Sequence, residues 1–132
     1  MRRTTISTGT PWEKAVGYSR AVRVGQHVFV SGTLSTDDDG NLVGPGDAYA
    51  QTAHVLRRIG HALDRAGLSM RDVVRTRMYI TDFTHEADIA RAHVEVFGEI
   101  RPAATMVAVS ALALPDALIE IEVDAMRDTS RD

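Results

Sequence analysis

Apolar and acidic residues alternate strictly in one short segment near the C-terminal end of the chain. Over residues 119–124 the apolar side chains of Ile119, Ile121 and Val123 take every second position, and an acid follows each of them. Side chains of a β-strand point alternately to its two faces, so this period of two predicts a strand with one apolar and one acidic face. The apolar face requires a core. The acidic face must meet water, a basic partner or a functional site.

The same alternation predicts four more strands, one of which is entered through Pro102. Gly25 lies in a short connection with the composition of a hairpin turn, so the first two of these strands are expected to pair with each other. A further short strand is expected before Gly9, and the segment around Trp12 is expected to be a loop. The predicted strands are residues 20–24, 27–32, 73–81, 101–109 and 119–124.

Two other segments repeat their apolar residues every three or four positions, which is the period of an amphipathic helix. The first runs from about Asp47 to Ala66 and is followed by Gly67, a typical helix stop. The second runs from Thr84 to about Ile100. The resulting order of elements predicts an α+β fold, with one mixed sheet and both helices packed on one of its faces.

The alternation also predicts which strand residues the helices cover. The covered rows are Val74, Met78 and Ile80, then Val107 and Val109, then Ile119, Ile121 and Val123. The opposite face should carry Arg75, Arg77, Tyr79, Ala104, Met106, Ala108, Glu120 and Glu122. A solvated sheet face normally carries more lysine and neutral polar residues. We therefore expect this face to meet other copies of the chain, with the arginines opposite the acids.

Composition narrows the class of protein. A chain of 132 residues is expected to form a single domain, residues 1–132. No apolar run approaches the roughly 20 residues of a membrane span, and no apolar stretch follows the basic N-terminus, so a cytoplasmic protein is expected. The absence of cysteine and the spacing of the histidines favour neither a metal site nor a cofactor. The net charge of −3 argues against nucleic acid as a partner.

Short motifs spread over about a hundred residues resemble those of the reactive-intermediate deaminase family, RidA/YjgF. Each motif is weak alone, and their order and spacing carry the resemblance. The motifs are Gly17-Tyr18-Ser19, Val30-Ser31-Gly32, Ala66-Gly67-Leu68, Asp72-Val73-Val74, Tyr79-Ile80-Thr81-Asp82, Pro102-Ala103 and Ile119-Glu120-Ile121-Glu122. The resemblance implies a chorismate-mutase-like fold and a homotrimer whose sheets form a central barrel, with small-molecule clefts between subunits.

The resemblance also implies a set of site residues. Active relatives hydrolyse reactive enamines or imines, and a glutamate on their last strand positions the attacking water. Glu120 matches this glutamate, and Tyr18 and Ser31 match residues of the cleft. Met106 stands where many relatives have cysteine, and Arg91 is placed where some have asparagine.

One position departs from the family pattern. Relatives with deaminase activity carry an arginine directly after Pro-Ala, where it holds the substrate carboxylate, and this chain has Ala104 there. A methyl group cannot form the paired hydrogen bonds that a guanidinium forms with a carboxylate. The substitution predicts weak hydrolysis of 2-aminoacrylate and a neutral or cationic ligand. Arg77 is a candidate replacement for the lost charge, and Arg101 is a second one.

The sequence therefore predicts a homotrimer that binds a small metabolite between its subunits. Its chemistry would be hydrolysis of a C–N bond by a water held at Glu120. The alternative is a metabolite-binding trimer without catalysis, in which Glu120 is the acid of an ion pair between subunits. A ribonuclease is disfavoured, because the chain is acidic and lacks a recognisable histidine pair.

Overall fold

The computed structural model describes residues 2–131 as a six-stranded sheet with helices. The strands are β1 (Arg3–Ile6), β2 (Ala21–Val24), β3 (His27–Thr33), β4 (Val73–Ile80), β5 (Ala103–Ala108) and β6 (Ile119–Met126). The α-helices are α1 (Pro11–Val16), α2 (Ala48–Arg65) and α3 (Glu86–Phe97). Three 3-10 turns are η1 (Met70–Asp72), η2 (Phe83–His85) and η3 (Thr129–Arg131).

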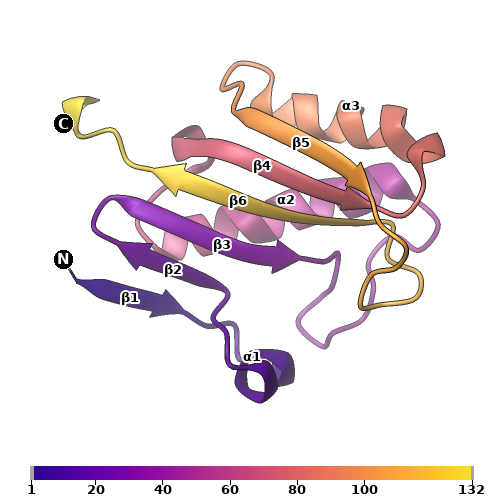
Figure 1. Ribbon diagram of the computed structural model, residues 1–132, viewed down its shortest axis with the longest axis horizontal. Coiled ribbons are helices and arrows are strands. Elements are labelled where there is room, and N and C mark those ends of the chain that lie inside the picture. Colours follow the sequence, from indigo (N-terminus) through magenta and orange to yellow (C-terminus); the bar gives the residue numbers. More distant parts are fainter. Residues whose placement is uncertain (1, 132) are drawn as a thin grey trace.

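The strands lie in the order β1-β2-β3-β6-β4-β5. Neighbours run antiparallel except β4 and β5, which are parallel and are joined by a crossover through α3. Figure 1 shows α2 and α3 side by side behind the sheet, with α1 beyond its lower end. The predicted α+β fold, one mixed sheet with two helices on one face, is confirmed.

The core lies between the sheet and its two long helices. β6 contributes the apolar row of the alternating segment, and its side chains are fully buried: Ile119, Ile121 and Val123. The facing row of α2 includes Val55, Leu56, Ile59 and Leu63, which are also buried. Burying one side chain of this size contributes about 1.5–3 kcal/mol to the stability of the folded chain. The period of two in β6 and the period of the helix therefore meet in one apolar layer.

The ends of α2 follow from residues visible in the sequence. The side chain of Asp47 accepts a hydrogen bond from the backbone N–H of Ala50, which caps the first turn. Gly67 takes a left-handed conformation with φ of 85° directly after the helix. None of the helices within residues 2–131 is long and apolar enough to cross a membrane.

The N-terminal segment differs in part from the prediction. The short strand before Gly9 is present as β1, but Trp12 lies on the helix α1 and not in a loop. Thr10 caps this helix and Pro11 occupies its first turn, where its missing N–H has no helical partner to lose. Six residues are too few to show a helical period. The sequence features that indicate this helix are its N-cap Thr10 and the following Pro11, not a repeat of apolar residues.

A bulge in β4 overturns one predicted row. The pairing of β4 with β6 shifts between Val73 and Arg75, so Val74 is an extra residue and 50% of it is exposed. Val73 is buried in its place, with 3% exposed. The prediction that the helices cover Val74 is therefore wrong. A strict period of two cannot anticipate an inserted residue.

The two faces of β5 are also reversed relative to the prediction. Met106 pairs with Met78 and packs against the core, so Ala104 and Ala108, two positions away on either side, share its helix-covered face. Val107 lies on the opposite face and is 40% exposed. β5 is an edge strand that pairs with β4 alone, so burial constrains its faces less. The face that carries Val107 could therefore point away from the helices.

Candidate functional site

The carboxylate of Glu120 lies directly against the backbone of Gly32. The pairing of β3 with β6 shifts between Val30 and Thr33, and Gly32 lies within this irregularity. A Cβ atom added to Gly32 would stand 3.0 Å from Cδ of Glu120 and 3.1 Å from its Oε2. A side chain at this position would push the carboxylate away by a few tenths of an ångström, so glycine allows it to lie where it does.

Arg20 approaches the same glycine from another side. It directly precedes β2, is 7% exposed, and donates from Nη2 to the carbonyl oxygen of Gly32 at 2.9 Å. Its guanidinium carbon lies 5.7 Å from the centroid of the Tyr18 ring, within the range of a cation–π contact. Tyr18, Arg20, Gly32 and Glu120 thus form one group, which we call the Gly32 site.

Ser31 holds two chain segments of this site together. Its hydroxyl donates to the carbonyl oxygen of Ser19 at 2.7 Å, and its backbone N–H donates to that of Arg20 at 3.0 Å. The Ser31 hydroxyl therefore donates its proton to the backbone of its own chain and not to a ligand. Ser31 fixes the segment that carries Tyr18 and Arg20 against β3.

Glu120 has the electrostatic setting of a general base. Partial burial raises the pKa of its carboxyl group, the positive charge of Arg20 opposes this, and the negative charge of Glu122 adds to it. The net effect is a raised pKa. Among the described residues, no hydrogen bond to the Glu120 carboxylate is formed. A carboxylate that is partly buried, more basic than usual and without a protein donor is suited to hold and deprotonate a water molecule.

The helix α1 supports the segment that leads to Tyr18. The buried carboxylate of Glu13 accepts hydrogen bonds from the hydroxyls of Ser7, Thr8 and Thr10 and from the backbone N–H of Thr8. Gly17, with φ of 90°, ends α1 and turns the chain toward Tyr18. Glu13 therefore anchors the loop before α1. Because Tyr18 follows α1, this anchor also helps to fix the position of Tyr18.

The two predicted site residues of β5 lie apart from this group within one chain. Ala104 and Met106 share the helix-covered side of the edge strand, whereas Glu120 lies on the open face opposite the helices. β4 and β6 separate the edge strand from β3. One chain alone therefore does not bring Ala104 and Met106 to Glu120.

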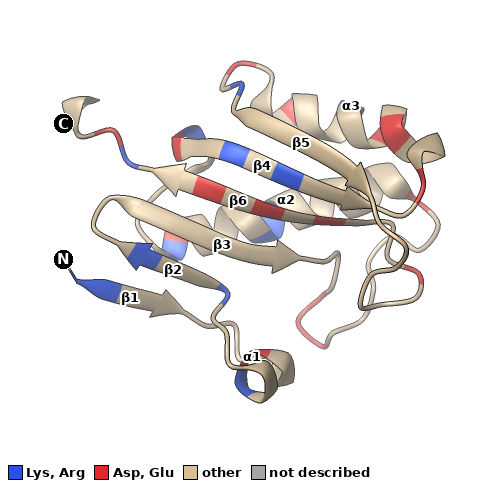
Figure 2. Ribbon diagram, in the orientation of Figure 1, with Lys and Arg blue, Asp and Glu red and all other residues tan. Residues whose placement is uncertain are grey.

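Arg77 is engaged by the acids of β6. Figure 2 shows basic positions of β4 beside acidic positions of β6. Nη1 of Arg77 lies 3.2 Å from Oδ2 of Asp124 and 4.0 Å from Oε1 of Glu122, and the hydroxyl of Tyr79 donates to Glu122. The Glu122 hydrogen bond is the main cause of a raised Tyr79 pKa. Arg77 thus pairs with neighbours of Glu120 on β6.

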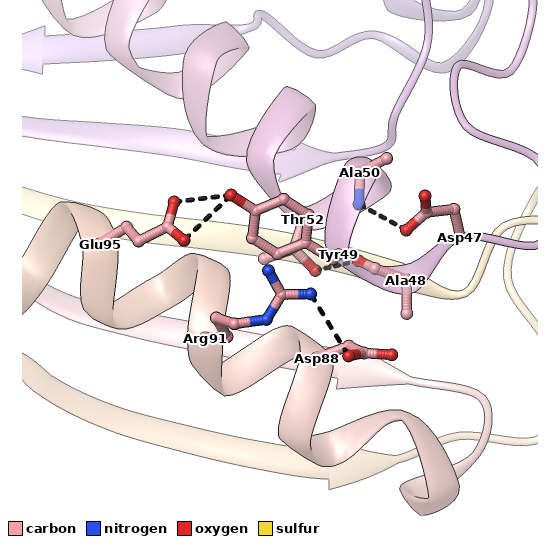
Figure 3. Close-up of polar contacts among 8 residues, drawn as sticks. All are labelled: Asp47, Ala48, Tyr49, Ala50, Thr52, Asp88, Arg91 and Glu95. Carbon is pink, nitrogen blue, oxygen red and sulfur yellow. Dashed lines mark hydrogen bonds and ion pairs between the residues drawn. The ribbon is translucent and has the colours of Figure 1, made fainter.

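Arg91 is held in the helical layer. Its guanidinium carbon lies 3.8 Å from the centroid of the Tyr49 ring, and its Nη2 lies 3.5 Å from Oδ1 of Asp88 (Figure 3). The Tyr49 hydroxyl donates to Glu95 at 2.7 Å, so the contact joins α2 to α3. Within one chain, Arg91 is not brought together with Tyr18 or Glu120.

Known proteins share this sequence pattern and this architecture. The family model described as Endoribonuclease L-PSP matches residues 10–127. The chain belongs to this family, which includes the RidA/YjgF proteins. A crystal structure of a YjgF/YER057c/UK114 family member from Mycobacterium tuberculosis is 47% identical, with a TM-score of 0.87, covering 96% of this chain and 100% of that one.

Other RidA/YjgF relatives agree. A protein named 3-aminoacrylate deaminase RutC from Acinetobacter baylyi is 42% identical over 116 residues, 88% of this chain and 90% of its own length. The Rid family protein YyfA from Yersinia pestis is 33% identical, with a TM-score of 0.83, covering 96% of this chain and 100% of that one. These matches confirm the family that the sequence motifs indicated.

Sequence reasoning missed one member of the Gly32 site, Arg20, and the residue that anchors the segment leading to it, Glu13. Arg20 was predicted only as the first residue of a strand, because nothing in a period of two predicts a buried arginine. Glu13 had a signal, since Thr10 and Glu13 have the spacing of a capping box. Among residues 2–131, no group of three or more histidine or acidic side chains is placed to hold a metal ion.

Proposed function

We propose that the protein is a cytoplasmic RidA/YjgF homotrimer that hydrolyses an imine or enamine through a water held by Glu120. The observation that carries this is the Glu120 carboxylate, which is partly buried against Gly32, has a raised pKa and accepts no hydrogen bond from the described residues. The relative named as a 3-aminoacrylate deaminase supports the same reaction class.

The reaction requires one proton acceptor and one water. Glu120 accepts a proton as the water oxygen adds to the carbon of the C=N bond, and it passes this proton to the nitrogen, which gives a carbinolamine. Glu120 then takes the proton of the new hydroxyl and passes it to the nitrogen as well. The C–N bond breaks, the C–O bond becomes a carbonyl and ammonia leaves, so both water protons end on the nitrogen. An enamine enters this sequence as its imine tautomer. Tyr18 and Ser31 are proposed to bound the ligand, with Ser31 acting through the backbone that it positions.

A second copy of the chain completes the proposed site. Ala104 and Met106 lie on an edge strand, away from the Gly32 site of their own chain. They can line a cleft with Glu120 only if the β5 edge of one subunit approaches the Gly32 site of another. We propose this arrangement, with Arg91 at the rim, and Arg77 within the paired charges of the open face that lines the central barrel.

A turnover experiment tests the proposal. Imino acids are generated in place by an amino acid oxidase and neutral imines by an amine oxidase, and the release of ammonia and carbonyl product is followed with and without the protein. We expect the protein to release ammonia faster than buffer alone from imino acids, from neutral imines or from both. If neither class is accelerated, the hydrolase proposal fails and metabolite binding without catalysis is the better account.

Assembly gives a separate prediction. The open face carries exposed apolar side chains, among them Phe29 and Met126, which favours its burial between copies. Glu122→Lys removes the acceptor of Tyr79 and places a second cation near Arg77, so we expect a weaker trimer. Light scattering at micromolar concentration should show a lower average mass than for Glu99→Lys, a matched change on the exposed helical side. A monomeric native protein would refute the trimer.

A further inference from the structure

Arg20 is a buried cation with one donor, Nε, that the described residues do not satisfy. Its Nη2 donates to Gly32, but its Nε is buried without any hydrogen-bond partner among the described residues. A buried donor without a partner is unfavourable, so a ligand acceptor is expected to lie beside it. The side chain lies beside the Glu120 carboxylate and over the Tyr18 ring, at the site for which the hydrolytic reaction is proposed.

A second arginine increases the positive charge at this place. Arg58 of α2 donates from Nη1 to the carbonyl oxygen of Leu34 at 2.6 Å. Burial lowers the pKa of Arg58, the nearby positive charge of Arg20 lowers it further, and the negative charges of Asp38 and Glu13 oppose this. Within residues 2–131, neither forms an ion pair shorter than 4.0 Å; the recorded pairs involve Arg77 and Arg91.

The nearby carboxylates form no close ion pair with either guanidinium. The negative charges of Asp38 and Glu13 act on Arg58, and that of Glu120 interacts with Arg20. Among the described residues, none of these acids lies within 4.0 Å of the two guanidinium groups. A guanidinium with an unpaired donor can form charge-assisted hydrogen bonds to a small anion.

We propose that Arg20 binds the carboxylate of the substrate, the role that the family resemblance gives to the position of Ala104. This inference rests on the proposed function, because it places a ligand at the Gly32 site. Arg20 and Glu120 flank Gly32, so a substrate held at Arg20 by its carboxylate presents the adjoining carbon to Glu120. The substrate class is then an α-imino acid or its enamine.

Other arginines fit this role less well. Arg77 already pairs with Asp124 and Glu122. Arg101 lies just before β5 and could reach this site only from a second copy, whereas Arg20 is held beside Gly32 and Glu120 of its own chain. The expectation of a neutral or cationic ligand was drawn from Ala104 alone. With Arg20 at the site, it is replaced by a preference for a carboxylate.

Binding of a matched ligand pair tests the inference without requiring turnover. Propionate and propionamide have nearly the same shape and differ in charge, so their affinities can be compared by ligand-observed NMR or calorimetry. We expect the native protein to bind propionate more tightly by about tenfold to a hundredfold, the range for a hydrogen bond to a charged group. A native protein with no such preference overturns the inference, whether or not it hydrolyses imines.

Variants test whether Arg20 is the source of the preference for propionate over propionamide. Arg20→Gln should lose most of this preference. Arg20→Lys should keep part of it, because the positive charge remains. Arg23→Gln is the matched control, since Arg23 is a partly buried arginine of the same segment that donates to Gly25 and Ala66, away from Glu120. If Arg20→Gln does not fold, the comparison of Arg20→Lys with the native protein decides. Full retention of the preference in a folded Arg20 variant contradicts the proposal.

Discussion

Glu13→Ala is expected to lower the free energy of unfolding by about 3 kcal/mol. The buried carboxylate collects donors from Ser7, Thr8 and Thr10, and hydrogen bonds to a charged group contribute about 1.5–3 kcal/mol each. The three hydroxyl residues are near the surface and will rebind water in the variant, so the sum must be discounted. Thermal or denaturant unfolding at a fixed protein concentration measures the change.

The control lies one residue away. Lys14 is exposed on the same helix, and Lys14→Ala should change stability by less than about 0.5 kcal/mol. A loss of less than about 1 kcal/mol for Glu13→Ala would show that the anchor of the N-terminal loop lies elsewhere. Because Gly17 and Tyr18 follow α1 directly, Glu13→Ala should also weaken ligand binding at the Gly32 site.

The pH dependence of this anchor has a definite sign. Burial raises the pKa of Glu13, but the donors from Thr8, Ser7 and Thr10 outweigh it, so the pKa of the folded state lies below the reference value of 4.5. A lowered pKa gives stability that is present above 4.5 and is lost as the pH falls through the folded-state value. The difference between native protein and Glu13→Ala should be full at neutral pH and should narrow below pH 4.5.

The fold was largely predictable because burial imposes periodicity. β6 has one face in the core, so its alternation had to be strict, and α2 shows a helical period for the same reason. The predictions failed where that constraint is weak. The edge strand β5 has one neighbour, Val74 occupies a bulge, and α1 is too short to repeat.

The candidate site was less predictable for a different reason. Glu120, Tyr18 and Ser31 were proposed as site residues through a family resemblance, and in the structure all three lie around Gly32. Arg20 was missed, because an arginine before a strand has no pattern that distinguishes a buried residue from an exposed one. Its role depends on contacts between segments far apart in sequence, which only the folded chain reveals.

Turnover is expected to fall by about a hundredfold or more in Glu120→Gln, because general base catalysis contributes about 10²–10⁴ in rate. Glutamine fills nearly the same space against Gly32 but cannot accept the proton of the attacking water. The rate of ammonia release from imino acids measures the effect. Glu95→Gln is the control, since Glu95 accepts from Tyr49 in the helical layer. Equal turnover in Glu120→Gln and native protein would exclude Glu120 as the base.

The pH profile distinguishes a base from a structural acid. Native turnover should decline as the pH falls through the raised pKa of Glu120, since the protonated acid cannot accept a proton. Arg20 opposes that rise while Glu122 adds to it, and Tyr79 pairs with Glu120 across the sheet. Arg20→Gln removes the opposing charge and should move the acid limb of the profile to higher pH. An acid limb that stays in place in this variant means that another group sets it, and the assignment of Glu120 as the base then fails.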